Sequence, residues 1–290
     1  MIQATDRVRR FSRAVTTELG VLDTSFLGRG RPLGAARVLN AIGHGKTTVD
    51  AVREHLGLDS GLMSRLLRGL EDEGLVLTKP DWADRRRRIL KLTEAGEAEF
   101  AAYEALSNEQ ATRMLARHPD RERLLAAFDL IATALGRDRI VIEERDPRDP
   151  DALNCLEAYY AELAARLEQG FDVSLSRDPE AQDMIHPRGI FLVAMSDGMP
   201  LGCVGLKGSG KPMAEIKRLW VAPDARRLGL ARRLMAVVED AARELGIQTL
   251  RLDTNSALPE AASLYRKTAW REIGRYNDDP YPDLFFEKRL

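Results

Sequence analysis

The stretch that decides the fold of the second half of the chain is Ala214–Leu234, with the sequence AEIKRLWVAPDARRLGLARRL. Its start predicts a strand, Pro223 predicts a turn, and the amphipathic remainder predicts the beginning of a long helix. The first turn of a helix leaves backbone N–H groups without intrahelical acceptors and carries the positive end of the helix dipole. Gly229 and Ala231 keep bulky side chains away from this corner. The pattern therefore predicts a cradle for an anion such as a pyrophosphate.

Strands and helices alternate on both sides of this segment. The periodicity predicts strands over 140–144, 190–196, 201–206, 215–221, 250–254 and 284–288, and helices over 151–169, 226–245 and 259–267. Such alternation is typical of an α/β domain.

A family resemblance rests on two motifs in this half. Val221-Ala222-Pro223 followed by Arg-x-x-Gly-x-Ala at 226–231 resembles motif A of the GNAT N-acetyltransferase superfamily. Residues 261–270, AASLYRKTAW, resemble its motif B, with Ala269 and Trp270 in place of the usual glycine and phenylalanine. The resemblance implies a GNAT fold with a mixed, mostly antiparallel sheet over residues 139–290. It also implies acetyl-CoA as cosubstrate, with no metal.

The same resemblance implies a set of binding residues. The backbone of one strand end would pair with the pantetheine arm, and the turn and helix start would hold the pyrophosphate. Leu228 stands where many members carry a basic residue. The cosubstrate-binding residues implied are Leu219, Trp220, Val221, Arg226, Arg227, Leu228, Gly229, Leu230, Ala231, Arg232 and Asn255.

The chemistry of amine acetylation points to two further side chains. A lysine-like amine is mostly protonated near neutral pH, so transfer needs a base, and the leaving thiolate needs an acid. Glu215 on the strand is the candidate base, although an ion pair with Lys217 or Arg218 explains it equally well. Tyr265, which the resemblance places near the thioester sulfur, is the candidate acid; its alternative role is packing on the sheet. The acidic, aromatic tail at 276–283 suits a cationic amine, and a solvated loop explains it as well.

The first half carries a pattern for two short helices around a turn. Thr47 or Thr48 caps a helix over 49–55, Gly57 ends it, and Asp59 or Ser60 caps the next. The second helix has a buried stripe of Leu62, Leu66, Leu67 and Leu70, and an opposite face of Gly61, Ser64, Arg65 and Arg68. Arginine pairs with guanine edges and serine with bases or phosphates, so the pattern predicts a helix-turn-helix.

A basic hairpin follows this helix. Residues 75–79 and 85–92 read as strands around a polar tip at 80–84, and the return strand carries Arg85, Arg86, Arg87 and Arg88. Arginine in such a wing suits the narrow minor groove of DNA, where the negative potential is deepest. Trp82 at the tip either packs under the hairpin or contacts DNA.

The hairpin and the following Leu92-Thr93-x-x-Gly96 resemble the MarR family of regulators, as does the pair Asp84 and Arg86. An aspartate in this place can hold an arginine extended toward DNA. The resemblance spans about residues 1–136 and implies a mainly α winged helix-turn-helix. It further implies a homodimer, formed through residues 7–27 and 94–135, that binds a pseudo-palindromic double-stranded operator. The predicted DNA-binding residues are Ser60, Ser64, Arg65, Arg68, Arg85, Arg86, Arg87 and Arg88.

The composition fits two globular domains. The chain has 290 residues, a formal net charge of −1 and only two cysteines, which argues against a disordered chain, a disulfide scaffold or a zinc site. No apolar run approaches the ~18 residues of a membrane span, and the first residues lack a signal-peptide pattern. We therefore expect a cytoplasmic protein without a membrane partner. The periodicity changes near Arg139, which predicts domains at 1–138 and 139–290 joined by a short polar tether.

Together the two motif sets predict a bifunctional protein, a transcriptional regulator that is also an acetyl-CoA-dependent N-acetyltransferase. Its acceptor is an amine, either a small molecule or a lysine side chain. Two alternatives stay open. The GNAT domain acts only as a sensor of acetyl-CoA, or the helical half serves an acetyltransferase merely as a dimerising scaffold.

Overall fold

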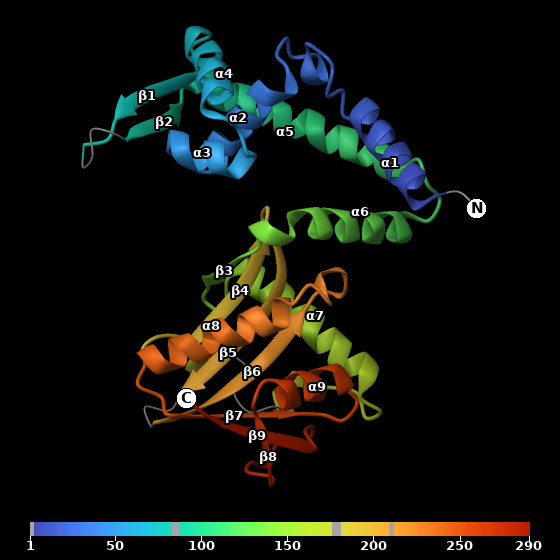
Figure 1. Ribbon diagram of the computed structural model, residues 1–290, viewed down its shortest axis with the longest axis vertical. Coiled ribbons are helices and arrows are strands. Elements are labelled where there is room, and N and C mark those ends of the chain that lie inside the picture. Colours follow the sequence, from blue (N-terminus) through green and yellow to red (C-terminus); the bar gives the residue numbers. More distant parts are fainter. Residues whose placement is uncertain (1–2, 83–86, 176–180, 209–211) are drawn as a thin grey trace. The chain divides into compact units, whose positions relative to one another are not determined.

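The computed structural model describes residues 3–82, 87–175, 181–208 and 212–290 (Figure 1). Internal contacts divide the chain into two compact units, Met1–Arg121 and Glu122–Leu290. The sequence analysis places the junction near residue 139. The contacts therefore group helix α6 (Arg121–Gly136) with the second unit, whereas the sequence assigned this segment to the first.

The first unit is mainly helical, as predicted. Its core lies between α2, α3, α4, α5 and a two-stranded antiparallel hairpin, and the side chains of Val38 and Leu39 on α2 are fully buried there. Its elements are α1 (Ala4–Glu18), α2 (Leu33–Gly43), α3 (Val49–Leu56), α4 (Ser60–Asp72), β1 (Val76–Pro80), β2 (Arg88–Leu92) and α5 (Glu94–Leu115), with a short 3-10 turn at Phe26–Gly28.

The structure contains helix caps and a glycine stop around α3 and α4 where the sequence predicts them. The hydroxyl of Thr48 accepts a hydrogen bond from the Ala51 N–H at 3.2 Å and caps α3, and Gly57 ends that helix with φ +64°. Asp59, rather than Ser60, caps α4 by accepting from the Leu62 N–H at 2.8 Å. The buried stripe of α4 is Met63, Leu67 and Leu70, with Leu62 and Leu66 only half-buried. Met63 is thus a core residue that the predicted stripe omitted.

The Leu-Thr-x-x-Gly segment has a physical reason in the packing of α5. Thr93 caps the helix by accepting from the Gly96 N–H at 3.0 Å, and it donates its own hydroxyl to the Gly74 carbonyl at 2.7 Å. A Cβ on Gly96 would lie 2.0 Å from the carbonyl oxygen of Leu75. Only glycine permits this approach, so the motif fixes α5 against the start of the wing.

The second unit is built on a seven-stranded sheet in the order β3-β4-β5-β6-β7-β9-β8. Among the described strands of this sheet, only β6 and β7 pair in parallel, so the sheet is mixed and mostly antiparallel, as predicted. Its strands are β3 (Val141–Glu144), β4 (Ile190–Ser196), β5 (Met199–Gly208), β6 (Met213–Val221), β7 (Thr249–Thr254), β8 (Arg271–Ile273) and β9 (Leu284–Arg289). Its helices, besides α6, are α7 (Pro150–Arg166), α8 (Leu230–Glu244) and α9 (Pro259–Lys267), with short 3-10 turns at 137–139, 173–175, 182–184 and 223–225.

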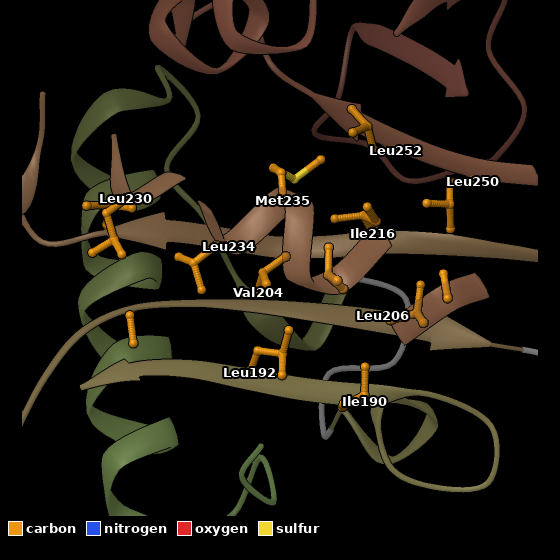
Figure 2. Close-up of a cluster of buried hydrophobic side chains, with 14 of the residues drawn as sticks. Ile190, Leu192, Val204, Leu206, Ile216, Leu230, Leu234, Met235, Leu250 and Leu252 are labelled. Atoms are coloured by element: carbon orange, nitrogen blue, oxygen red, sulfur yellow. The ribbon is translucent and has the colours of Figure 1, made fainter. Parts of the chain in front are cut away.

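Helices cover both faces of this sheet. Alternate residues of β4 point to opposite sides. Ile190 and Leu192 join the core under α8, and Phe191 and Val193 join the core under α7. In Figure 2, Leu234 and Met235 of α8 lie over side chains of several strands. Burying both faces fixes the directions in which the strand ends leave the sheet.

Two further differences from the sequence expectations concern the tether and strand β8. The predicted tether is occupied by the end of α6 and a 3-10 turn at Arg137–Arg139, which leads directly into β3. Strand β8 was not predicted, since a three-residue strand is too short to show an alternation. Among the described residues, no helix combines the length and the apolar character needed to cross a bilayer.

Candidate active site and nucleic-acid interface

Strands β6 and β7 separate in the middle of the sheet. Their parallel pairing covers only Met213–Ile216 against Thr249–Leu252, while β7 continues beside β9. The register of β6 against β5 shifts next to Arg218, whose φ is +59°. Beyond this bulge, Leu219–Val221 has no strand partner on its β7 side within the described chain. An extended ligand therefore has an open strand edge to pair with.

The corner between β6 and α8 has the predicted open form. Arg227 and Gly229 have φ values of +64° and +82°, which turn the backbone before α8 begins at Leu230. Within the part of the chain that the structure describes, the N–H groups from Arg227 to Arg232 donate to no protein acceptor. A Cβ on Gly229 would meet nothing within 4 Å. The corner is neither filled by side chains nor bonded within the protein, so it fits a pyrophosphate.

Side chains around the corner have distinct surroundings. Arg227 and Arg232 are exposed, Leu228 and Ala231 are half-buried, and the side chain of Leu230 is buried in the core. On the preceding turn, Asp224 accepts a hydrogen bond from the Thr133 hydroxyl of α6 at 2.8 Å. Because its side chain is buried, Leu230 can contact a ligand only through its backbone.

Arg226 holds the corner to α7. Its guanidinium donates to the Val221 carbonyl at 3.0 Å and to Glu162 at 2.5 Å, and Glu162 also accepts from the Trp220 indole at 3.0 Å. Burial alone would raise the pKa of the Glu162 carboxyl, but hydrogen bonds from Arg226 and Arg166 hold that pKa below its ordinary value. Arg226, predicted as a phosphate ligand, is thus engaged in positioning the strand end.

A cleft opens where β6 and β7 diverge. Its lining combines aromatic rings with polar residues of β6 and β7. Its lining includes Tyr159, Tyr160, Leu163, Leu167, Phe171, Ile216, Lys217, Arg218, Leu219, Asp253, Thr254, Asn255, Leu258, Ala261, Tyr265, Asp279, Tyr281 and Pro282. Predicted residues Leu219, Asn255 and Tyr265 are brought together here, and Glu215 is not part of the lining.

Lys217 lies between two carboxylates. Its ammonium contacts the oxygens of Asp253 at 2.6 and 2.8 Å and Glu215 at 3.6 Å. Asn277 also donates its side-chain amide to Asp253 at 2.6 Å. Glu215 therefore lies beside the cleft in an ion pair with Lys217, one of the two partners that the sequence offered. Asp253, unlike Glu215, belongs to the lining of the cleft itself.

Tyr265 presents its hydroxyl to the cleft without a protein hydrogen bond among the described residues, and the rest of its side chain is buried. Burial, followed by the nearby Asp253 carboxylate, raises the pKa of the Tyr265 phenol above its ordinary value. The hydroxyl therefore stays protonated at neutral pH. The turn after α9 keeps a left-handed conformation at Ala269, with φ +63°, although glycine is absent there. Alanine at position 269 is thus compatible with a left-handed turn directly after α9, the helix that carries Tyr265.

The acidic segment 276–283 is an ordered wall of the cleft. Arg275 donates to the carbonyls of Asp279 at 2.9 Å and Pro282 at 2.7 Å, and Asn255 donates to the Tyr281 carbonyl at 2.6 Å. Asp279 is buried, and its carboxylate accepts from the Tyr281 N–H at 3.1 Å. This segment is therefore held by its own hydrogen bonds, which argues against a merely solvated loop.

The first unit presents the predicted polar face of α4. Ser60, Ser64, Arg65 and Arg68 are all exposed, opposite the buried stripe of the same helix. Helix α3 is joined to the wing by a bridge between Thr48 and Ile89. This arrangement fixes the orientation of α4 relative to the hairpin, as a winged helix requires.

The wing is described only in part. Arg87 is exposed, and Arg88 forms an ion pair with Glu71 of α4 at 3.5 Å. Asp84, Arg85 and Arg86 lie outside the described residues. Trp82 is 95% exposed, so of its two predicted roles the structure excludes packing under the hairpin.

Comparison with known proteins agrees with this geometry. A model of the acetyltransferase (GNAT) family matches residues 156–270, and a model of the MarR family matches residues 29–87. An IAA acetyltransferase of Azospirillum brasilense is 35% identical over 116 residues, which are 38% of this chain and 74% of that protein. The chain belongs to the GNAT acetyltransferase family. Its first unit is a MarR-family winged helix.

Other relatives of this GNAT acetyltransferase cover the same unit. An N-acetyltransferase of Schizosaccharomyces pombe is 34% identical over 102 residues, 34% of this chain and 63% of that protein. An acyl-CoA N-acyltransferase structure from Klebsiella pneumoniae covers 52% of this chain and 97% of that chain, at 26% identity and a TM-score of 0.41. Use of an acyl-CoA cosubstrate follows from the family and from the open corner.

Several cleft residues were missing from the sequence prediction. Tyr159, Lys217, Asp253 and Tyr281 come from four separate segments, and none of the four lies within the two motifs of the resemblance. One signal was present for Asp253: a carboxylate near the end of an otherwise buried, alternating strand needs a partner. Its partners Lys217 and Asn277 are distant in sequence, so only the fold reveals them.

Proposed function

We propose that this GNAT acetyltransferase acetylates an amine with acetyl-CoA and that the same chain, as a homodimer, binds operator DNA through its MarR unit. The observation that carries the enzymatic part is the run of N–H groups at 227–232 without protein acceptors, beside an open strand edge. These groups match the pyrophosphate and pantetheine of acetyl-CoA, which supplies the acetyl thioester. The protonated hydroxyl of Tyr265, whose ring is buried, lies in the cleft next to that edge.

The proposed roles follow from the positions of the side chains. Tyr265 donates a proton to the thiolate that leaves when the carbon–sulfur bond breaks. Glu215 takes the proton that the amine loses as its nitrogen bonds to the acetyl carbon, through a water that bridges Glu215 to the cleft. Lys217, which contacts both Glu215 and Asp253, holds the two carboxylates in place.

The regulatory part is supported by two surfaces of the first unit. The exposed hydroxyl and guanidinium groups on α4 suit base edges and phosphates. Helix α1 buries none of its residues, and its Val8 is 66% exposed and its Phe11 38% exposed. In a homodimer, a second copy of the chain would cover these apolar side chains. Their exposure on α1 therefore supports the proposed homodimer.

The test is a thiol-release assay over amino acids, polyamines, aminoglycosides and lysine peptides, alongside operator binding by the same preparation. We expect turnover with one acceptor class and retention of DNA from upstream of the gene. Tyr265→Phe should lower kcat by about 100-fold and leave acetyl-CoA affinity and operator binding unchanged. Tyr276→Phe, which removes a hydroxyl outside the cleft lining, is the matched control.

The two alternatives give different results in this experiment. A pure sensor binds acetyl-CoA and changes operator affinity but releases no thiol with any amine. A transferase with a scaffolding helical half turns over and ignores DNA. Either result overturns the bifunctional proposal.

A further inference from the structure

Resting on the proposed acetyltransferase function, we propose that the cleft accepts an amino acid with an apolar or aromatic side chain, whose carboxylate is bound by Arg218. The inference concerns the substrate class and uses side chains that no motif identifies. It depends on the backbone conformation of Arg218, on the charged side chains around it, and on the aromatic rings of the cleft lining.

Arg218 is a buried cation in an unusual backbone conformation. It is 7% exposed, lines the cleft, and sits at the bulge of β6 with φ +59°. A non-glycine residue in this region costs about 1 kcal/mol or more, and such residues cluster at functional sites. Without the bulge, the pleat of β6 would direct residue 218 differently. The strained backbone at the bulge thus carries a guanidinium that lines the cleft.

Among the cations of the lining, Arg218 has the geometry best suited to a carboxylate. Lys217 is neutralised by Asp253, which is also hydrogen-bonded by Asn277. Asp279 accepts from a backbone N–H of its own loop. A guanidinium has five N–H donors in one plane, so a contact to the protein is compatible with two parallel hydrogen bonds to a carboxylate. Arg218 already lies over the Tyr160 ring, 5.7 Å from its centroid.

The lining also contains a row of neighbouring aromatic rings, one of which is Tyr160. Tyr159 and Tyr160 lie 5.6 Å apart between ring centroids, Tyr160 stacks on Phe171 at 5.6 Å, and Phe171 contacts Tyr281 at 4.7 Å. The Tyr281 hydroxyl accepts from the Asp172 N–H at 2.8 Å, which holds Tyr281 beside the segment that carries Phe171. Such a row of rings fits a flat or branched apolar side chain and offers little to a hydrated one.

This combination separates the acceptor classes. An amino acid places its carboxylate on Arg218 and its side chain on the rings, leaving its amine to react. A polyamine or an aminoglycoside has no carboxylate to pair with the guanidinium, and it would place hydrated polar groups against the aromatic rings. The structure therefore favours an amino-carboxylate acceptor over a polycation.

The experiment compares L-phenylalanine with phenethylamine, which has the same ring and amine but no carboxylate, and with spermidine. We expect kcat/KM for L-phenylalanine to exceed that for phenethylamine by about 10-fold or more, because the charged hydrogen bonds to Arg218 are lost with the carboxylate. Arg218→Gln should remove this preference, lowering kcat/KM for L-phenylalanine about 10- to 100-fold and for phenethylamine less than about 3-fold. Arg218→Lys keeps the charge and should fall between the two. Arg243→Gln on the exposed face of α8 is the matched control.

Two results overturn the inference. The first is a higher kcat/KM of the wild type for spermidine or phenethylamine than for L-phenylalanine. The second is an equal loss of kcat/KM for L-phenylalanine and phenethylamine in Arg218→Gln while acetyl-CoA affinity is unchanged. Calorimetric binding of N-acetyl-L-phenylalanine keeps the inference separate from catalysis. If no amine yields thiol, the transferase proposal fails. The inference then stands if this ligand binds and Arg218→Gln weakens it, and it falls if this ligand does not bind.

Discussion

The two units present proposed phosphate-binding features of opposite kinds. On α4 the cationic groups are side chains, Arg65 and Arg68, exposed on the solvent face of an ordinary helix. At the start of α8 the donors are main-chain N–H groups, directed by the positive φ values of Arg227 and Gly229. One surface depends on which side chains are present and the other on the path of the backbone.

This difference has consequences for how each feature responds to change. A side-chain surface can be weakened one residue at a time and depends on formal charge, so salt screens it. A backbone corner carries only partial charges from the peptide dipoles and responds chiefly to changes in its conformation. The comparison therefore predicts separate sensitivities for DNA and acetyl-CoA binding by one chain.

The largest expected effect is that of salt on operator binding. A dimer that makes about six phosphate contacts should lose about 1,000-fold in affinity between about 50 and 200 mM salt. Acetyl-CoA affinity should change by less than about 10-fold over the same range, since few formal charges hold it. Fluorescence anisotropy of labelled operator and calorimetry of acetyl-CoA measure the two slopes. Parallel slopes would contradict the comparison.

Variants of α4 test whether its arginines make the salt-dependent contacts to operator DNA. The double variant Arg65→Ala/Arg68→Ala should weaken operator binding by about 1–3 kcal/mol per arginine and relax base specificity. Arg113→Ala removes an equally exposed arginine from α5 and is the control. Operator affinity that falls equally in the control would move the interface away from α4.

The next effect in size concerns the corner. Gly229→Ala places a methyl group in the open space where the phosphates would lie and strains φ +82°, so we expect a loss of acetyl-CoA affinity of about 30-fold. Gly246→Ala is the matched control. That residue has φ +75° and equally open surroundings, and it follows the other end of α8.

Calorimetry and thermal unfolding of both variants separate binding from stability. Both should lose similar stability, about 1 kcal/mol, whereas only Gly229→Ala should bind acetyl-CoA more weakly. Arg227→Ala, which removes an exposed side chain from the same corner, should lose less than about 5-fold. A larger loss of acetyl-CoA affinity in Arg227→Ala than in Gly229→Ala would show that side-chain charge, rather than the backbone N–H groups, dominates binding at the corner.

Most of the fold was accessible from the sequence because its signals are local. Caps at Thr48 and Asp59, the left-handed Gly57 and the Gly96 contact are each determined by a few neighbouring residues. The short strand β8 and the grouping of α6 with the second unit escaped prediction. Both depend on pairing with distant segments: β8 on β9, and Thr133 of α6 on Asp224.

The candidate site was predictable only where it is made of backbone. The corner at 226–232 follows from one motif, and its open N–H groups agree with the prediction. The side-chain roles needed tertiary structure: Arg226 is held by Glu162, and Lys217 brings Glu215 close to Asp253. No spacing in the sequence encodes these partners, since the bulge at Arg218 changes which way the strand residues face.

The smallest expected effect tests whether every arginine of the first unit belongs to its exposed cationic surface. Arg29 and Arg31 are instead bound by the buried Glu99 of α5, with N···O distances of 2.5 and 2.8 Å. The hydrogen bond from Arg29 holds the pKa of Glu99 below its ordinary value of 4.5, against the opposing effect of burial. Glu99→Gln should therefore lower the free energy of unfolding by about 1 kcal/mol at neutral pH and leave operator affinity unchanged.

The pH dependence gives the sign of this effect. A carboxyl whose folded pKa is lowered stabilises the fold above its unfolded pKa, and that contribution is lost as the pH falls through the folded value. The stability difference between wild type and Glu99→Gln should thus be complete above about pH 5 and shrink as the pH falls below 4.5. Urea unfolding followed by far-ultraviolet circular dichroism measures it, with Glu97→Gln, exposed on the same helix, as control. A difference that grows toward acid would show that Glu99 is protonated in the folded state and that Arg29 and Arg31 are held by other groups.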